Sequence, residues 1–180
     1  MHSHLKLVRD FHEQFGIKQP DYPDTVHLSD MDIVMRQALL MDCGSETFKA
    51  ITAGDLTQIL AGLVDLAYNA LAAIACRGDE VIATSVNWRQ DGSVLSVMRV
   101  LADKINHCAS GETIHYSALY SICEQLARGF VNADFDKAFG MVHNNLMNSV
   151  HRATSAHDYS QRLAQEALPQ APDLSDALYE

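Results

Sequence analysis

The sequence predicts an all-α protein, a helical bundle of about six or seven helices. Three observations support this fold class. Apolar residues recur at spacings of three and four, which places them on one face of a helix. Glycine and proline are sparse, with 9 and 4 in 180 residues, so few positions interrupt a helix. The 48% hydrophobic content is enough for a substantial core in a chain of this length.

Three helices are expected in the first half of the chain. Ser29 and Asp32 form a capping-box-like start for the second of them. Asp55 is the expected N-cap of the third, and Gly78 is its expected C-terminal stop. The predicted helices cover residues 4–15, 29 to about 52, and 55 to about 77.

The second half is expected to add three helices and a short fourth one. They cover about residues 94–108, 114–128, 133–150 (capped by Asn132) and 158–167. Residues 81–84 allow two interpretations, either a short strand or a helix turn and loop. The chain after Pro169 looks frayed and acidic. We therefore expect a single domain over residues 1–155 and a C-terminal tail over 156–180.

Composition excludes several classes of function. The net charge of −10 opposes binding to nucleic-acid phosphate. The four cysteines show no metal or redox spacing and are expected to be reduced thiols. The apolar stretch 56–76 is interrupted by Asp65 and Asn69, so we interpret it as a buried helix and not as a membrane span. With no secretory signal in view, the expected location is cytoplasmic.

Acidic residues on two of the predicted helices carry the functional information. Asp42 and Glu46 are four residues apart and share one helix face, as do Asp65 and Asn69. If the two helices pack antiparallel, these oxygens converge between them. Convergent carboxylates are how helical bundles bind hard divalent ions.

These helices resemble the all-α nucleoside triphosphate pyrophosphohydrolases, the superfamily of MazG, the dimeric dUTPases and phosphoribosyl-ATP pyrophosphohydrolase. That family carries E-E-x-x-E on one helix and E-x-x-D on the next. Residues 42–46 correspond to the first motif and residues 62–65 to the second. Segments 11–16 and 139–147 resemble the phage and bacterial MazG-like branch. The resemblance covers about 5–80 and 130–150, and 85–130 is then a probable helical insertion.

The chain departs from the family pattern at two acidic positions. Cys43 and Gly62 stand where glutamates are expected, so three carboxylates remain of five. Asn148 lies close to the place of a usual lysine. Cys43 is a soft donor and a poor Mg²⁺ ligand. Gly62 is open to two interpretations that are compatible, a lost ligand and a close helix contact.

The resemblance implies a MazG-like fold and Mg²⁺-dependent hydrolysis of a nucleoside triphosphate, standard or non-standard, to a monophosphate and pyrophosphate. Glu46 and Asp65 would hold Mg²⁺ (or Mn²⁺), with Asp42 in an outer or shared role. Asn69, His143 and Asn145 are the candidate substrate contacts. The family also implies a homo-oligomer, a dimer or tetramer, with neither nucleic acid nor a membrane as partner.

Two other classes of function remain open at this point. The first is a catalytically weakened relative that binds nucleotide or a protein partner without efficient turnover. The second is a purely structural helical dimer. In that last case Glu46 and Asp65 would belong to a polar network, for example with Arg36 or Lys49, and Asn69 would be a packing amide.

Overall fold

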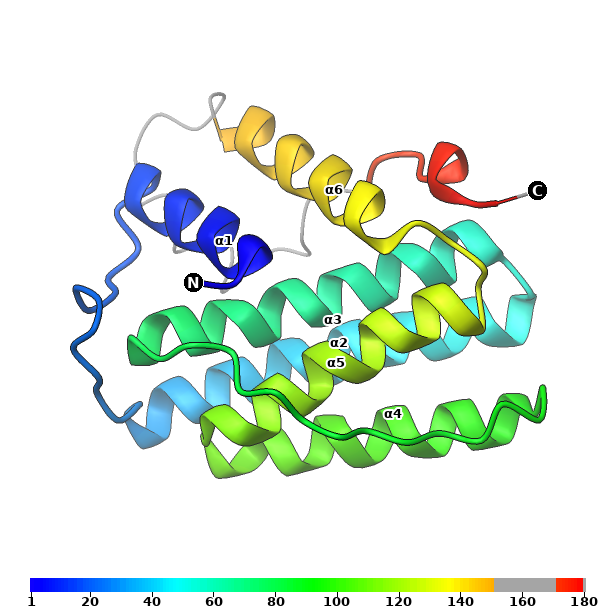
Figure 1. Ribbon diagram of the computed structural model, residues 1–180, viewed down its shortest axis with the longest axis horizontal. Helices are drawn as coiled ribbons and strands as arrows, with labels where there is room; N and C mark the ends of the chain where they lie inside the picture. The colour runs from blue at the N-terminus through cyan, green and yellow to red at the C-terminus, as the bar shows by residue number, and fades with distance from the viewer. Residues whose placement is uncertain (151–170, 180) are drawn as a thin grey trace.

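The computed structural model describes residues 1–150 and 171–179 and confirms the predicted all-α class. Within these residues the secondary structure is helical and no strand is formed (Figure 1). The elements are α1 (Ser3–Gln14), α2 (Asp30–Ala53), α3 (Leu56–Arg77), α4 (Val94–His107), η1 (Cys108–Ser110), α5 (Thr113–Gly129), α6 (Phe135–Val150) and η2 (Ser175–Ala177).

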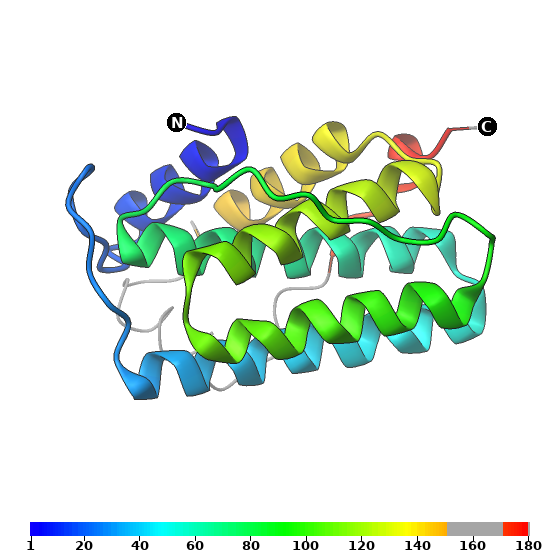
Figure 2. The same ribbon diagram turned by 60° about the horizontal axis from the view of Figure 1, so that its bottom comes forward.

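Four long helices form the body of the molecule. α3 packs against α2 on one side and α5 on the other, and α4 packs against both α2 and α5. α1 and α6 lie on the outer side of this body and both contact α3 (Figures 1 and 2). The connection 79–93 runs the length of the bundle before α4 begins. This crossover makes each neighbouring pair of the four long helices antiparallel, an arrangement known for helical bundles.

α3 is the core helix of the bundle. By length and composition alone it could cross a membrane, with mean hydropathy 1.8 over its most apolar window, but 78% of that window is buried inside the protein. Its neighbours α1, α2, α5 and α6 surround it. The apolar character of this segment is therefore accounted for by helix packing, as expected from the sequence.

Capping residues explain where the helices begin and end. The Ser29 hydroxyl accepts a hydrogen bond from the backbone N–H of Asp32, whose carboxylate in turn accepts from Ser29, so the expected capping box is confirmed. Asp55 caps α3 by accepting from the Gln58 N–H. Gly78 ends α3 with φ +74°, a conformation that favours glycine.

The start of α6 differs from the prediction. Asn132 is not the cap: it adopts φ 59°, and α6 begins at Phe135. The carboxylate of Asp134 instead accepts a hydrogen bond from the Lys137 N–H at 3.0 Å. Residues 81–84 form no strand. They run along α5 in extended form, where Ile82 N–H donates to the Ser117 hydroxyl at 3.0 Å.

The end of the chain is packed, and the expectation of a frayed segment is wrong for residues 174–178. Leu174 is fully buried, and Ala177 is 1% exposed. The carbonyl of Ala177 accepts from the Asp134 N–H at 2.8 Å, and Ala133 and Leu178 form an isolated bridge. The helix predicted over 158–167 lies outside the described residues.

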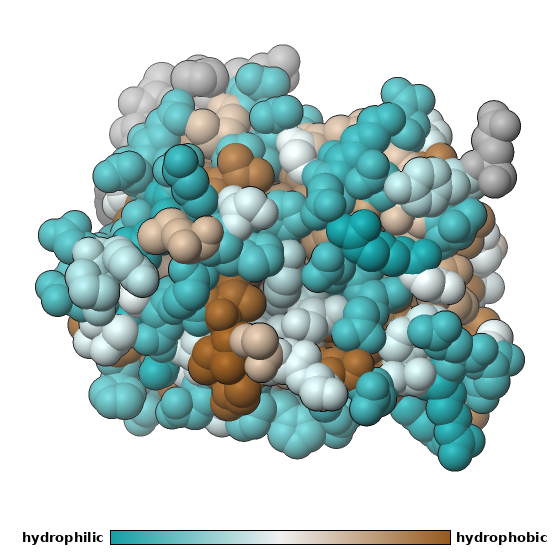
Figure 3. Space-filling view, viewed as in Figure 1, coloured by the Kyte–Doolittle hydropathy of each residue, from teal (hydrophilic) through white to brown (hydrophobic). Residues whose placement is uncertain are grey.

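The face formed by α4, α5 and the 79–93 connection is largely hydrophilic, with small separate hydrophobic areas (Figure 3). All four cysteines are free thiols, and three of them are buried. No disulfide therefore contributes, and packing of the helices stabilises the fold.

Candidate functional site

The candidate acidic residues lie on a helical hairpin. α2 carries Asp42 and Glu46, and α3 carries Asp65. The two helices are joined by only Gly54 and Asp55, and the short connection makes them antiparallel neighbours. The register brings the middle of α2 beside the middle of α3, as the Asn69 Nδ2 to Cys43 Sγ distance of 3.7 Å shows.

One large cavity collects most of the predicted site residues. Its volume is about 1500 Å³, and it lies between α1, the loop after α1, α2, α3 and α6. Five predicted residues line it: Asp42, Glu46, Asp65, Asn69 and Asn145. The structure thus brings together side chains from both motif helices and from α6, which is far away in sequence.

Asp65 has the most unusual environment of the three carboxylates. It is largely withdrawn from solvent, and its carboxylate has no hydrogen-bond or ion-pair partner among residues 1–150 and 171–179. Burial raises the pKa of Asp65 to about 7, because the charged form loses hydration without compensation. A carboxylate left in this state is suited to receive a cation or a proton.

Glu46 and Asp42 are exposed at the same cavity. Glu46 Oε1 accepts a hydrogen bond from Lys49 Nζ at 2.7 Å, one turn further along α2. Exposed ion pairs of this kind contribute only about 0–1 kcal/mol, so Glu46 can exchange Lys49 for another cation. Of the two cationic partners that the sequence offered for Glu46, the structure shows an ion pair with Lys49 and none with Arg36.

Cys43 is a buried neutral thiol. Burial raises its pKa to about 12, and the nearby charges of Asp65 and Asp42 act in the same direction. Its sulfur lies beside the Asn69 amide, which also donates to the backbone carbonyl of Asp65 at 2.9 Å. Cys43 therefore cannot supply the anionic oxygen that a glutamate would bring to this position.

Gly62 is a close contact between α2 and α3. A Cβ atom at this position would lie 2.9 Å from the Cβ and 3.2 Å from the Cα of Thr47, and closer still to its hydroxyl. Thr47 is fixed there because its hydroxyl donates to the Cys43 carbonyl at 2.7 Å. The packing interpretation of Gly62 is thus realised, and a glutamate does not fit at this position in the present helix spacing.

Whether a divalent ion can bind in this cavity depends on which side-chain donors line it. Within the described residues, no group of three or more His, Cys, Asp or Glu side chains is arranged to hold a metal ion. The partnerless carboxylate of Asp65 and the exposed Glu46 and Asp42 still suit Mg²⁺, which commonly takes one or two carboxylates and completes its shell with water and phosphate. The donor set fits an open site of this kind and does not fit a closed protein cage.

His143 lies beside the cavity and does not line it. It is buried on α6, and its Nδ1 is 3.1 Å from the hydroxyl of Tyr68. Burial lowers the pKa of His143. Because Tyr68 lines the cavity, His143 is placed to position Tyr68. Of the two α6 candidates, Asn145 lines the cavity itself, beside Val142 and Leu146.

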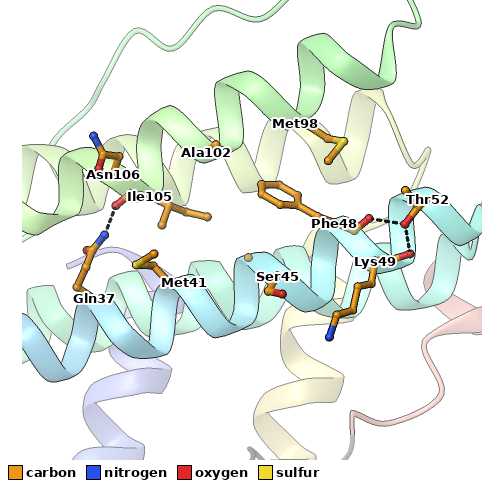
Figure 4. A pocket seen from close by; sticks show the side chains of 11 residues that line it. Gln37, Met41, Ser45, Phe48, Lys49, Thr52, Met98, Ala102, Ile105 and Asn106 are labelled. Carbon is orange, nitrogen blue, oxygen red and sulfur yellow. Dashed lines mark hydrogen bonds between the residues drawn. The ribbon is translucent and has the colours of Figure 1, made fainter.

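Sequence reasoning missed two features of this region. Arg36 lines the cavity as a positively charged wall residue, seven residues before Cys43 and hence on the same face of α2. A separate cavity of about 530 Å³ lies between α2 and α4, with Phe48, Met98 and Ile105 pointing into it (Figure 4). In the sequence, the second cavity could have been inferred only from the apolar residues of α2 that lie away from its buried face.

The geometry therefore defines one acidic cavity on a helical hairpin, with a half-buried Asp65 carboxylate that has no partner among the described residues. The resemblance to the all-α pyrophosphohydrolases is based on the motif residues of this hairpin. No family model, no curated protein and no solved structure matches this chain.

Proposed function

We propose that this protein is a MazG-like, Mg²⁺-dependent nucleoside triphosphate pyrophosphohydrolase, which cleaves a nucleotide, standard or non-standard, to a monophosphate and pyrophosphate. The observation that carries the proposal is the carboxylate of Asp65, which is partnerless among the described residues and faces the same cavity as Asp42 and Glu46. The cavity of about 1500 Å³ exceeds the usual range of ligand sites, about 300–1,000 Å³. It therefore has room for a nucleotide, a metal ion and water.

The residues that would hold the metal are Asp65 and Glu46. A bound Mg²⁺ or Mn²⁺ supplies neutralisation of phosphate charge, the main requirement of phosphoryl chemistry. Metal binding keeps Asp65 ionised, although its pKa is raised in the free protein. Glu46 would exchange its ion pair with Lys49 for the metal, and the ammonium group of Lys49, which also lines the cavity, would then be available to phosphate.

The other cavity residues orient the reactants. Asp42 is the remaining carboxylate on this face and can accept a hydrogen bond from the attacking water. Asn69 and Asn145 line the cavity and present amides that suit ribose or base contacts. Tyr68 contributes an aromatic edge whose hydroxyl is held by His143.

A second candidate function has its own observation. Two carboxylates that the family pattern expects are absent. Cys43 is a neutral thiol in place of one of them, and the Gly62–Thr47 contact leaves no space for the other. A relative with three carboxylates would bind a nucleotide or a protein partner without efficient turnover, since the loss of a transition-state group costs orders of magnitude in rate.

The test is pyrophosphate release from a panel of standard and modified nucleoside triphosphates, with Mg²⁺ or Mn²⁺. Asp65→Asn and Glu46→Gln are the site variants. Glu13→Gln, an exposed carboxylate on α1 outside the cavity, is the matched control. We expect release to fall at least about 100-fold in both site variants and to be unchanged in Glu13→Gln.

Other outcomes decide between the two candidates. Saturable nucleotide binding without release above background would support the weakened relative. Release that is equal in the wild type and in Asp65→Asn would remove this cavity as the active site.

A further inference from the structure

The guanidinium of Arg36 is the most conspicuous unsatisfied group in the cavity that the proposed reaction does not use. Arg36 is half-buried, and its Nε is buried without a hydrogen-bond partner. Among the described residues no carboxylate forms an ion pair with it. Asp32, one turn earlier on α2, is engaged by Ser29 instead. The guanidinium interacts with the thiol of Cys76, but this contact does not neutralise its charge. Arginine stays charged in proteins, so a half-buried guanidinium without a carboxylate partner among the described residues is suited to bind an anion.

Other cationic groups gather around Arg36. Arg9 donates from Nη2 to the Pro20 carbonyl at 2.8 Å, but its Nη1 is buried without a partner. Lys18 lines the same end of the cavity from the loop after α1. Burial lowers the pKa of His12 to about 4, and the charges of Arg36 and Arg9 act in the same direction. In a chain of net charge −10, positive charge is concentrated at this end of the cavity, where Asp32 is the carboxylate that lines the wall beside Arg36.

This cationic end is distant from the carboxylates. Arg36 and Glu46 are ten residues apart on α2, which corresponds to about 15 Å along the helix axis. The same separation is found along α3, which runs antiparallel to α2. Cys76 of α3 lies near Arg36, and Asp65 is eleven residues before Cys76. The cavity is continuous between the two ends. Neighbouring phosphates of one triphosphate group are too close together to span this distance.

We propose that Arg36 and Lys18, which both line the α1 end of the cavity, form a second binding site for a phosphate-class anion there. The ligand is a free anion, inorganic phosphate or pyrophosphate, because the triphosphate of a nucleotide held at the carboxylates does not reach this end. The assignment of the carboxylate end to hydrolysis rests on the proposed function. The anion site itself does not, because it depends only on the cationic groups at this end of the cavity and on the buried Nε of Arg36, which has no hydrogen-bond partner among the described residues.

The test is calorimetric titration of the full chain with inorganic pyrophosphate, in EDTA and at physiological salt. We expect saturable binding by the wild type. Arg36→Gln should weaken it about tenfold or more, since a charge-assisted hydrogen-bonded pair is removed. Arg36→Lys keeps the charge and should show a smaller loss. Arg99→Gln, an exposed arginine on α4 outside the cavity, should bind as the wild type does.

The design separates this site from the hydrolytic one. Asp65→Asn should lose pyrophosphate release but retain metal-free pyrophosphate binding. Repeating the titration with a saturating α,β-methylene nucleoside triphosphate tests whether the two sites are separate. Unchanged pyrophosphate binding supports a second site, and competition would show that pyrophosphate occupies the phosphate site of the nucleotide, which overturns the proposal. The proposal is overturned if the wild type shows no saturable binding, or if Arg99→Gln weakens binding as much as Arg36→Gln does. Circular dichroism of each variant verifies that it is folded.

Discussion

At the scale of single residues, Gly62 sets the distance between the two helices that carry the acidic residues. We expect Gly62→Ala to destabilise the protein by about 1–3 kcal/mol, because the new methyl group must displace the Thr47 side chain or separate the helices. Urea unfolding measures the effect. Gly140→Ala is the matched control: it is also in a helix, and a Cβ there meets no atom within 4 Å.

The control should behave in the opposite way. Alanine is favoured over glycine in a helix by about 0.5–1 kcal/mol, so Gly140→Ala should be neutral or stabilising. Equal effects of the two substitutions would show that Gly62 is not a tight contact.

Asp65 links the site to the pH dependence of stability. Its pKa is raised from 3.8 to about 7 in the folded chain by burial. The unfolded chain therefore releases this proton first, and the metal-free protein loses stability as pH rises from about 4 to about 7. The loss is worth at most about 1.4 kcal/mol per pH unit in that window. Asp65→Asn removes it.

The measurement is urea unfolding of the wild type and Asp65→Asn at pH 5 and pH 7.5 in EDTA. The stability of Asp65→Asn relative to the wild type should be greater at pH 7.5 than at pH 5. A difference that is the same at both values would mean that Asp65 is not desolvated in solution.

At the scale of helices, His4 attaches α1 to the bundle. Its ring stacks on Phe139 at 4.1 Å, and its Nδ1 is 2.9 Å from the Tyr120 hydroxyl. Burial lowers its pKa from 6.5 to about 4, although Asp136 opposes the shift. The unfolded chain takes up this proton first on acidification, so the contribution of His4 is present above pH 6.5 and is lost as pH falls toward 4.

We expect His4→Phe, which keeps the stacked ring but cannot titrate, to flatten the fall in stability between pH 6.5 and 4.5. Thermal unfolding across this range measures the slope. The pKa of His12 is also lowered, and His12 remains in the variant. The dependence of stability on pH should therefore decrease and not vanish. Substitution of the exposed His27 by Gln should leave the slope unchanged.

Helix ends were predictable from sequence where local chemistry decides them. Ser29, Asp55 and Gly78 act within one turn of their own helix, and each is placed as expected. The start of α6 was not predictable, because Asn132 and Asp134 are both good cap residues. Hydrogen bonds from the distant C-terminal segment decide between them.

In the candidate site, too, features that depend on local sequence were predictable and features that depend on distant contacts were not. The four-residue spacing on two neighbouring helices predicted which acidic residues share a face, and the structure places them in one cavity. Their catalytic and metal-binding roles remain predictions. Arg36 was not expected as a ligand group, since its surroundings are formed by the loop after α1 and by α3. Spacing along one helix carries no information about such contacts.

At the scale of the whole molecule, α2 has an apolar face that the described residues leave exposed. Met31, Val34, Met35 and Met41 are 47–65% exposed along this helix, and Met41 also lines the smaller cavity between α2 and α4 (Figure 4). Contiguous exposed apolar surface marks interaction sites. We expect this face to mediate the homo-oligomer that the family resemblance implies.

Light scattering during size-exclusion chromatography measures the oligomeric state. The double variant Val34→Lys and Met41→Lys should elute as a monomer while the wild type does not. Ile82→Lys changes an exposed apolar residue away from α2 and should leave the assembly unchanged. A wild-type monomer would contradict the expectation directly.

The two-residue connection between α2 and α3 has a consequence for the order of folding. Asp42, Glu46 and Asp65 all belong to one local hairpin, whereas the crossover 79–93 must be closed before α5 can complete the core. Local contacts form before distant ones, because short loops lose less entropy on closure. The three carboxylates of the hairpin therefore come together while the rest of the chain is still unfolded and the hairpin is exposed to water. Water screens their repulsion at that stage, and the cost of desolvating Asp65 arises only when the remaining helices close over the hairpin.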